Sequence, residues 1–397
     1  MAGRASLAFL GQEDLALSAD PEVTYFIEKY KGSTHFSSRV DKVQFENGAI
    51  NFGQEQIVYI PKSGDLITAM YLKLFSPYTV STYVLDSVGT LMINYIELYI
   101  GNACIERIYG EYIEMKMDLE IPTGKQASLQ GLIGKTPPTA RNPSAQIASS
   151  YTIPLPFSCI KGGLPLCLIK DPVFFRISFA PASLFTVAKA SYDGPVKSFL
   201  HVEYTYLADS EIAYIKSKPQ TRLIEQVQRQ SFYAPQGRVY NQCLLEFVNP
   251  VKELFFVIQN DTAQGYDYTL TAPATIDTGS SVFGTGDQLI QMNLIFNSTE
   301  RISTDIGNPV FLSTIQSLEY HTRKPDRKFY TYSFSIDPEG DAPTGSVNLS
   351  MIKDQIIQLT LNPSGSGREI RVYASSYNFL NFENGKTGLA FKNANVS

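Results

Sequence analysis

Residues 66–75 read LITAMYLKLF, in which Leu66, Met70, Leu72 and Leu74 occupy alternate positions. Successive side chains of a β-strand point to opposite faces, so this spacing predicts a strand with one apolar face. Such a face must be covered by another layer of structure. The segment therefore predicts one strand of a packed β-sheet.

Segments of the same kind occur along the whole chain, separated by clusters of Gly, Pro, Asn and Asp. They are residues 92–101, 173–180, 199–207, 252–259, 328–336, 356–361 and 369–374. Short strands spread in this way indicate antiparallel β-sandwiches and argue against a parallel βαβ sheet. Helices are predicted only in the opening arm, over 109–120, and for one or two turns within 208–216.

The composition is that of an ordinary folded chain, with 44% hydrophobic and 18% charged residues. The length of 397 residues predicts roughly two to three domains. Residues 217–221, SKPQT, interrupt the strand pattern near the midpoint. They leave two halves of roughly 180 residues, each the size of one sandwich. The chain has 24 Tyr and 24 Phe but no Trp, and Tyr suits both strands and protein contacts.

The opening arm has a helical pattern of its own within residues 18–36, SADPEVTYFIEKYKGSTHF. Apolar residues recur there on one helix face, at Val23, Phe26, Ile27 and Tyr30. Asp20, Pro21 and Gly32 suit the cap, the first position and the end of such a helix. A helix of about ten residues is not stable alone in water, so its aromatic face is expected to dock on another surface.

The residues give little support for nucleic-acid binding, metal binding or catalysis. A net charge of -5 leaves no basic footprint for nucleic acid. His35, His201 and His321 lack ligand spacing, so no metal and no cofactor is predicted. The best-marked serine hydrolase signal, a G-x-S-x-G elbow, is missing. The carboxylates of EYIEMKMDLE (111–120) are expected on a solvated helix face.

Cysteine usage and targeting signals point to a reducing compartment. Four cysteines form no C-x-x-C pair and are expected to be buried free thiols: Cys104, Cys159, Cys167 and Cys243. The N-terminus is not expected to act as a signal peptide, and no apolar run is long enough to span a membrane. Four triplets match the N-glycosylation pattern, beginning at Asn260, Asn297, Asn348 and Asn395. The first three are the candidate modification sites.

Three stretches are predicted as loops or turns. Residues 121–150 are rich in Pro, Gly and Ser with little periodicity, which is typical of a long surface loop. The glycines of 281–288 and 363–369 lack the context of a phosphate loop and are interpreted as hairpin turns.

Distinctive segments follow one another in order along the chain. The series opens with VTYFIEKYKGSTHF (23–36), QFENGAINFG (44–53) and SGDLITAMYLKLF (63–75). It continues with INYIELYIGNACIERIYGEYIE (93–114), IPLPFSCIKGGLPLCLI (153–169) and VEYTYLADSE (202–211). It ends with RLIEQVQ (222–228), FVNPVKELFFVIQN (247–260) and YHTRKPDRKFYTYSFSIDPEGDAPTGSVNLSMI (320–352). In this order the segments resemble the major capsid proteins of nucleocytoplasmic large DNA viruses.

The resemblance implies an all-β fold of two consecutive eight-stranded antiparallel jelly rolls with few short helices. It divides the chain into an N-terminal arm with a short helix (1–31), a first jelly roll (32–215) and a second jelly roll (216–397). It also implies a structural virion protein and not an enzyme. Homotrimers of such a protein form pseudo-hexagonal capsomers of an icosahedral capsid, assembled in the host cell cytoplasm.

The implied partners are neighbouring capsomers and minor capsid proteins beneath the shell, without direct contact to nucleic acid. The arm would dock through five residues: Val23, Tyr25, Phe26, Ile27 and Tyr30. Residues 121–150 and 261–288 are candidates for an outer tower or for contacts within the trimer. Two alternatives remain at this point: a minor capsid or scaffold protein with the same fold, and a carbohydrate-binding β-sandwich.

Overall fold

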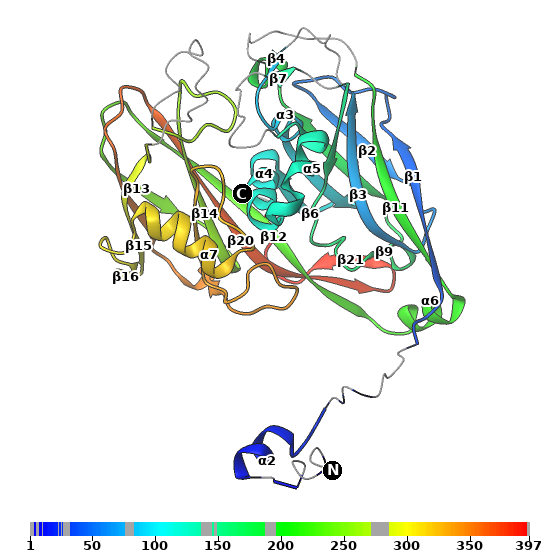
Figure 1. Ribbon diagram of the computed structural model, residues 1–397. Coiled ribbons are helices and arrows are strands. Elements are labelled where there is room, and N and C mark those ends of the chain that lie inside the picture. Colours follow the sequence, from blue (N-terminus) through cyan, green and yellow to red (C-terminus); the bar gives the residue numbers. More distant parts are fainter. Residues whose placement is uncertain are drawn as a thin grey trace. The chain divides into compact units, whose positions relative to one another are not determined.

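The computed structural model describes residues 4, 8–9, 11–22, 24, 26, 32–75, 83–135, 145–146, 149–186, 196–270 and 286–394. The chain forms two units, an N-terminal unit of Met1–His35 and a body of Phe36–Ser397. A helix of the N-terminal unit, α2, covers Gln12–Ser18 and has Glu13 and Asp14 in its first turn. All the sheets drawn in Figure 1 belong to the body.

The first half of the body is a sandwich of two antiparallel sheets. One sheet has the order β1 (Phe36–Gln44), β11 (Ser198–Leu207), β3 (Leu66–Phe75) and β8 (Ser150–Pro154), and β9 (Leu164–Pro165) also pairs with β3. The other has the order β2 (Glu55–Ile60), β10 (Val173–Phe179), β5 (Ile93–Ile100) and β6 (Ala103–Tyr109). A small two-stranded sheet joins β4 (Tyr83–Val84) to β7 (Ala145–Gln146).

The second half repeats this arrangement. One sheet has the order β12 (Gln220–Ala234), β20 (Arg368–Glu383), β14 (Pro250–Asn260) and β17 (Tyr330–Ser333), with β18 (Val347–Asn348) and β21 (Lys386–Leu389) as additions. The other has the order β13 (Tyr240–Leu245), β19 (Gln355–Leu361), β15 (Leu289–Phe296) and β16 (Thr299–Ile302).

The two halves share one strand order. When the main strands of each half are numbered along the chain, one sheet reads 1-8-3-6 and the other reads 2-7-4-5 in both halves. Neighbouring strands are antiparallel, and the last strand returns to lie beside the first, as in a jelly roll. The fold is therefore two consecutive jelly rolls, as predicted, and we call the two kinds of sheet the 1-8-3-6 sheet and the 2-7-4-5 sheet.

Helices lie mainly in the connection between strands 5 and 6 of each roll. In the first roll this connection holds α4 (Gly110–Glu120) and α5 (Thr123–Ile133), and in the second it holds a π-helical turn (Phe311–Ile315) that runs into α7 (Gln316–Tyr320). Short α3 (Val88–Leu91) precedes β5, and α6 (Asp209–Lys216) joins the rolls. In the part of the chain that the structure describes, single turns of 3-10 helix cover Leu166–Leu168, Ala182–Leu184 and Leu349–Met351. Among the described residues no helix is long and apolar enough to cross a membrane.

Each roll has its own apolar core, and the first core continues into the second roll. Leu254, Phe256 and Ile258 of β14 point into the core of the second roll. Their neighbours Phe255 and Val257 point the opposite way and belong to the core cluster of the first roll. The continuous apolar run of β14 is thus explained, because this strand is buried on both faces.

Most predicted strands are confirmed, and the differences have local causes. Residues 66–75 coincide with β3, but the register shift opposite Glu203 and Tyr204 puts Ile67 in the core instead of Leu66. A β-bulge moves the next side chain to the other face, which an alternation count cannot anticipate. The loop predicted for 121–150 is wrong for Thr123–Ile133, which forms α5.

The close approach of α4 to β5 and α3 requires a glycine at position 110. A Cβ atom there would lie 2.2 Å from the carbonyl oxygen of Ile93 and 2.3 Å from that of Thr90. We predict that Gly110→Ala lowers the free energy of unfolding by about 1–3 kcal/mol, since overpacking forces backbone shifts. Gly131→Ala on α5 is the matched control, because its Cβ meets no atom within 4 Å. Chemical denaturation of both variants tests this, and equal stabilities would contradict it.

Candidate functional site: the joint between the two rolls

Helix α4 lies between the two rolls and is buried along most of its length (Figure 1). It starts directly after β6, so the first roll fixes its position, and its ring contacts reach the second roll. The ring of Tyr112 lies 5.4 Å from that of Phe255 in an edge-on contact and 6.2 Å from that of Tyr373. We call the contact of α4 and its surroundings with the second roll the joint.

Glu111 anchors the first turn of α4 to β20. Arg371 donates from Nη2 to Oε1 of Glu111 at 2.7 Å and from Nε to Oε2 at 2.8 Å, a bidentate pair. The hydroxyl of Tyr268 donates to the same carboxylate at 2.8 Å, and that of Tyr373 also donates to it. Burial raises the pKa of the Glu111 carboxyl, but the charge and hydrogen bonds of Arg371 outweigh it and leave the pKa below its ordinary value.

Arg327 reaches from the second roll into the first, and its side chain is only 2% exposed. Its Nε donates to Oε1 of Glu114 at 3.1 Å, and its Nη2 donates to Oδ2 of Asp86 and to the Ser87 hydroxyl, both at 2.9 Å. Its Nη1 donates to the carbonyl oxygen of Tyr266 at 3.1 Å. Burial lowers the pKa of this guanidinium, but the charges of Glu114 and Asp86 raise it above its usual range.

Asp118 lies one turn further along α4 and is fully buried. It pairs with two cations, Lys135 and Arg323. Lys135 donates to its Oδ1 at 2.7 Å, and Nη1 of Arg323 donates to the same atom at 2.8 Å. The backbone amide of Asp326 donates to its Oδ2 at 2.8 Å. Burial raises the pKa of Asp118, but the charge of Lys135 and its hydrogen bond outweigh it, so the net pKa is lowered.

The expectation that the α4 carboxylates lie on a solvated face is wrong. Glu114 and Asp118 are fully buried. Burial of these charges is tolerated because each has cationic partners and hydrogen bonds that replace water. Most of those cations come from residues 323–371, more than 200 positions away, so the helix pattern alone could not reveal them.

A continuous ribbon also crosses the joint. β12 and β20 pair from Gln220 opposite Phe382 to Ala234 opposite Arg368. On the side of the first roll, Nε2 of Gln226 donates to the carbonyl oxygen of Ile105 at 2.6 Å. The ribbon therefore belongs to a sheet of the second roll and is hydrogen-bonded to the first roll as well.

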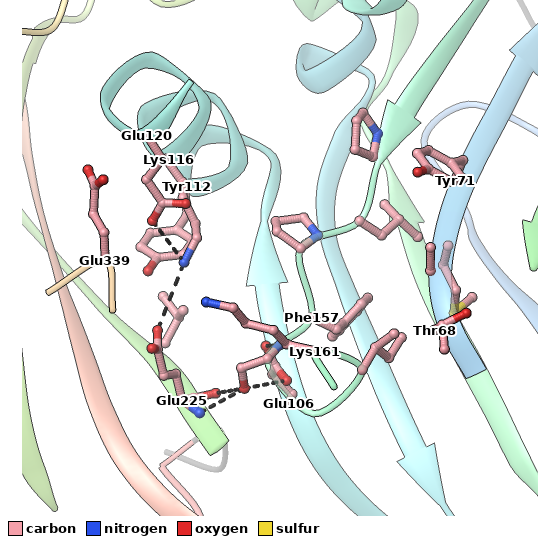
Figure 2. Close-up of a pocket in the computed structure, with 18 of the residues that line it drawn as sticks. Thr68, Tyr71, Glu106, Tyr112, Lys116, Glu120, Phe157, Lys161, Glu225 and Glu339 are labelled. Atoms are coloured by element: carbon pink, nitrogen blue, oxygen red, sulfur yellow. Dashed lines mark hydrogen bonds and ion pairs between the residues drawn. The ribbon is translucent and has the colours of Figure 1, made fainter. Parts of the chain in front are cut away.

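A cavity of about 310 Å³ lies at the joint, between α4, residues 154–161, β12 and residues 338–339 (Figure 2). Lys116 bridges its walls, with its Nζ 3.1 Å from Oε1 of Glu120 and 3.9 Å from Oε2 of Glu225. Glu106 lines the cavity as well and accepts from the amide of Ser158 at 2.9 Å and from that of Cys159 at 3.2 Å. Burial raises the pKa of Glu106 to about 7, although these hydrogen bonds act to lower it.

Two of the three histidines contact neighbouring side chains, and the third is exposed. His321 lies between Oε1 of Glu253 at 2.6 Å and Oε1 of Glu339 at 3.1 Å. Burial lowers its pKa, but these two carboxylates raise it to about 10. His201 packs against Phe199, and His35 is exposed. Within the described part of the chain, no group of three or more His, Cys, Asp or Glu side chains is arranged to hold a metal ion.

The arm residues predicted to dock fall mostly outside the described residues: Val23, Tyr25, Ile27 and Tyr30. Phe26 is described and is 95% exposed. Pro21, Glu22 and Thr24 are not helical, and the helix described in this unit lies earlier, at α2.

The glycosylation candidates differ in access. Asn260 is only 6% exposed, and its amide donates to the carbonyl oxygens of Thr269 and Leu270. It is therefore not accessible in this fold. Asn297 and Asn348 are exposed. All four cysteines are free thiols, and three are buried as predicted, while Cys167 is half-buried.

Sequence reasoning missed the cationic half of the joint, chiefly Arg323, Arg327 and Arg371. A signal was available in RKPDRK (323–328), where four cations precede a buried strand. Such a dense charge cluster beside an apolar strand is a place to look for buried ion pairs.

Comparisons with known proteins agree with this fold. Residues 24–212 match the family model for the major capsid protein N-terminus, and residues 211–388 match that for the large eukaryotic DNA virus major capsid protein. Together the two models span nearly the whole body. The chain belongs to the major capsid protein family of large eukaryotic DNA viruses. As a member, it is a structural protein of the virion and not an enzyme.

Relatives in this family match over their full length. The chain is 28% identical over 405 residues to the major capsid protein of Pyramimonas orientalis virus, covering 98% of this chain and 99% of that protein. It is 23% identical over 446 residues to the major capsid protein of Paramecium bursaria Chlorella virus 1, with coverage of 98% and 99%.

Solved structures show the same fold. The PBCV-1 virus capsid, a quasi-atomic model, superposes with a TM-score of 0.80 at 21% identity, covering 93% of this chain and 100% of that one. The Faustovirus major capsid protein gives a TM-score of 0.72 at 11% identity, with 96% of each chain covered. The double jelly roll of this capsid protein thus persists at low sequence identity.

Removing the central cation of the joint should destabilise the capsid protein strongly. We predict that Arg327→Met lowers the free energy of unfolding by about 3–5 kcal/mol, because it removes the guanidinium that pairs with the buried carboxylates of Glu114 and Asp86. Exposed Arg301 supplies the control, Arg301→Met. Adding Glu114→Gln to Arg327→Met should recover part of the loss. Denaturant titrations measure all four proteins, and a loss below that of the control would refute the assignment.

The raised pKa of Glu106 makes stability depend on pH. Between about 4.5 and about 7 the unfolded chain ionises this carboxyl while the folded chain keeps its proton. The free energy of unfolding should therefore fall as pH rises through this window, by roughly 3 kcal/mol at the limit. Glu106→Gln cannot ionise, so it should flatten the profile, whereas exposed Glu383, changed to Gln, should not. Thermal melts from pH 4 to 8 measure the stability of all three proteins. A Glu106→Gln profile that matches the wild-type profile would contradict the prediction.

Proposed function

We propose that three copies of this chain form a homotrimeric capsomer with a pseudo-hexagonal outline, and that such capsomers tile an icosahedral shell. The observation that carries the proposal is the repeated strand order, 1-8-3-6 and 2-7-4-5, in both rolls of one chain. Two similar rolls per chain make six in a trimer, which approximates a hexagon and allows near-hexagonal tiling.

The joint supports the same proposal. A hexagonal block needs its two rolls at a fixed angle, and a joint with buried ion pairs and interlocked rings resists rotation. Arg327, Arg371 and Tyr112 each bridge the two rolls through contacts to named partners. Well-satisfied polar networks of this kind favour a single arrangement of the parts they connect.

We also propose the division of the chain into an arm (1–31), a first jelly roll (32–215) and a second jelly roll (216–397). In this proposal the arm contacts minor capsid proteins beneath the shell through Val23, Tyr25, Phe26, Ile27 and Tyr30. Neighbouring capsomers are the other partners. Assembly in the host cell cytoplasm agrees with four free thiols, since reducing compartments keep thiols unpaired. Asn297 and Asn348 are the accessible candidates for glycosylation.

The trimer is tested by the mass of the purified protein in solution. We expect light scattering to give three times the chain mass of 44.1 kDa, with hexagonal outlines in negative-stain images of the same fraction. The mass should stay constant on dilution through the micromolar range, because obligate interfaces are large. A folded monomer at high concentration would contradict the proposal.

A further inference from the structure

The two rolls carry helices in equivalent connections. In the first roll, the segment between strands 5 and 6 holds α4, and in the second roll it holds the π-helical turn and α7. Because the strand orders are the same, these helices leave corresponding edges of the two sandwiches. Among the described residues, α4 packs on a sheet of the other roll, whereas α7 packs on β17 of its own roll.

Helix α4 covers the outward face of the 1-8-3-6 sheet of the second roll. Phe255 of β14 and Tyr373 of β20 lie on that face, and they are 3% and 0% exposed. Tyr112 packs on both rings, and Glu111 pairs with Arg371. The contact thus combines aromatic packing with an acidic helix on a basic sheet.

The corresponding face of the first roll is open. On the outward side of its 1-8-3-6 sheet, Val40 is 59% exposed, Tyr71 38% and Phe75 36%. The ring of Phe199 lies 5.8 Å from that of Phe75. The ammonium of Lys42 lies 4.2 Å from the centre of the Phe199 ring. This face therefore resembles the covered one in having aromatic rings beside a basic side chain.

The helical connection of the second roll also has exposed apolar side chains. Val310 is 63% exposed, Leu318 is 67% exposed and Ile315 is 40% exposed. Glu319, next to Leu318, is exposed as well. Exposed apolar residues that gather on one helix are typical of a protein contact. The outward side of this helix is therefore an exposed apolar surface with an acidic residue beside it.

We propose that α7 of one copy, with the turn before it, docks on the outward face of the β1-β11-β3-β8 sheet of a second copy of this chain. The joint within the chain supplies the template for this contact. Leu318 and Val310 would pack on Val40, Phe75 and Phe199, and Glu319 would face Lys42. The contact is thus the joint repeated between chains.

Such a contact is heterologous, since each copy offers one helix and one sheet. Contacts of this kind close into a ring when the rotation between copies is right. The inference rests on the proposed trimer, in which the joint and the new contact would alternate around the ring. To the proposed trimer it adds the two surfaces that meet between neighbouring chains.

Two variants test the contact, one on each surface. Leu318→Asp places a charge on the helix and Val40→Asp places one on the sheet, at positions exposed enough to leave the fold unchanged. Met351→Asp is the control, because Met351 is 76% exposed and belongs to neither surface. Light scattering should give a threefold lower mass for each interface variant and the wild-type mass for the control, with unchanged circular dichroism.

Mixing the two variants tests the heterologous geometry. The intact helix of the Val40→Asp chain can still dock on the intact sheet of the Leu318→Asp chain. The mixture should therefore contain a species of two chains, although each variant alone is monomeric. An interface in which helix meets helix would give no such recovery.

The outcomes separate this inference from the proposed function. If the wild type is a trimer and both variants remain trimers, the surface assignment is overturned and the capsomer stands, with the sheet face left for another occupant such as the arm. If the wild type is a monomer, the capsomer falls and this contact falls with it. Loss of the trimer in both variants together with recovery in the mixture would support the inference.

Discussion

The burial of the Arg327 guanidinium is the constraint on which the rest of the structure depends. A charge with 2% of its side chain exposed requires several partners, and those partners come from both rolls. Glu114 belongs to α4, Asp86 to the segment before α3, and Tyr266 to the second roll. The two rolls can satisfy this charge in one relative position only, because a shift of an ångström would break several hydrogen bonds at once. The joint is therefore specific as well as apolar.

The two rolls repeat one architecture but differ in which sheet face is covered. Both rolls have the same strand order and the same kind of helical connection. In one roll the 1-8-3-6 sheet is covered by the other half of the chain, so its outward rings are buried. In the other roll the same face remains exposed and keeps charged and aromatic side chains. One architecture thus gives one covered face and one exposed face.

Much of the fold could be predicted from sequence, because alternation of apolar residues is a local property. The strand at 66–75 was predicted with its bounds, and the helix at 109–120 nearly so. The joint could not be predicted, since the arginine partners of Glu114 and Asp118 lie more than 200 positions away and only the fold brings them together. The same holds for Glu106, whose raised pKa comes from burial between layers. Helix α5 was missed because its Gly and Ser residues hide a helical segment.

The paired ribbon of β12 and β20 gives the molecule a mechanical property. Fifteen residues of β12 are in register with β20, a length of about 50 Å. Since this ribbon belongs to the second roll and also contacts the first, a load that bends the molecule there acts against many backbone hydrogen bonds at once. The molecule should therefore be stiff along the length of this ribbon. In a capsid made of such molecules, elastic deformation should then concentrate at the contacts between molecules.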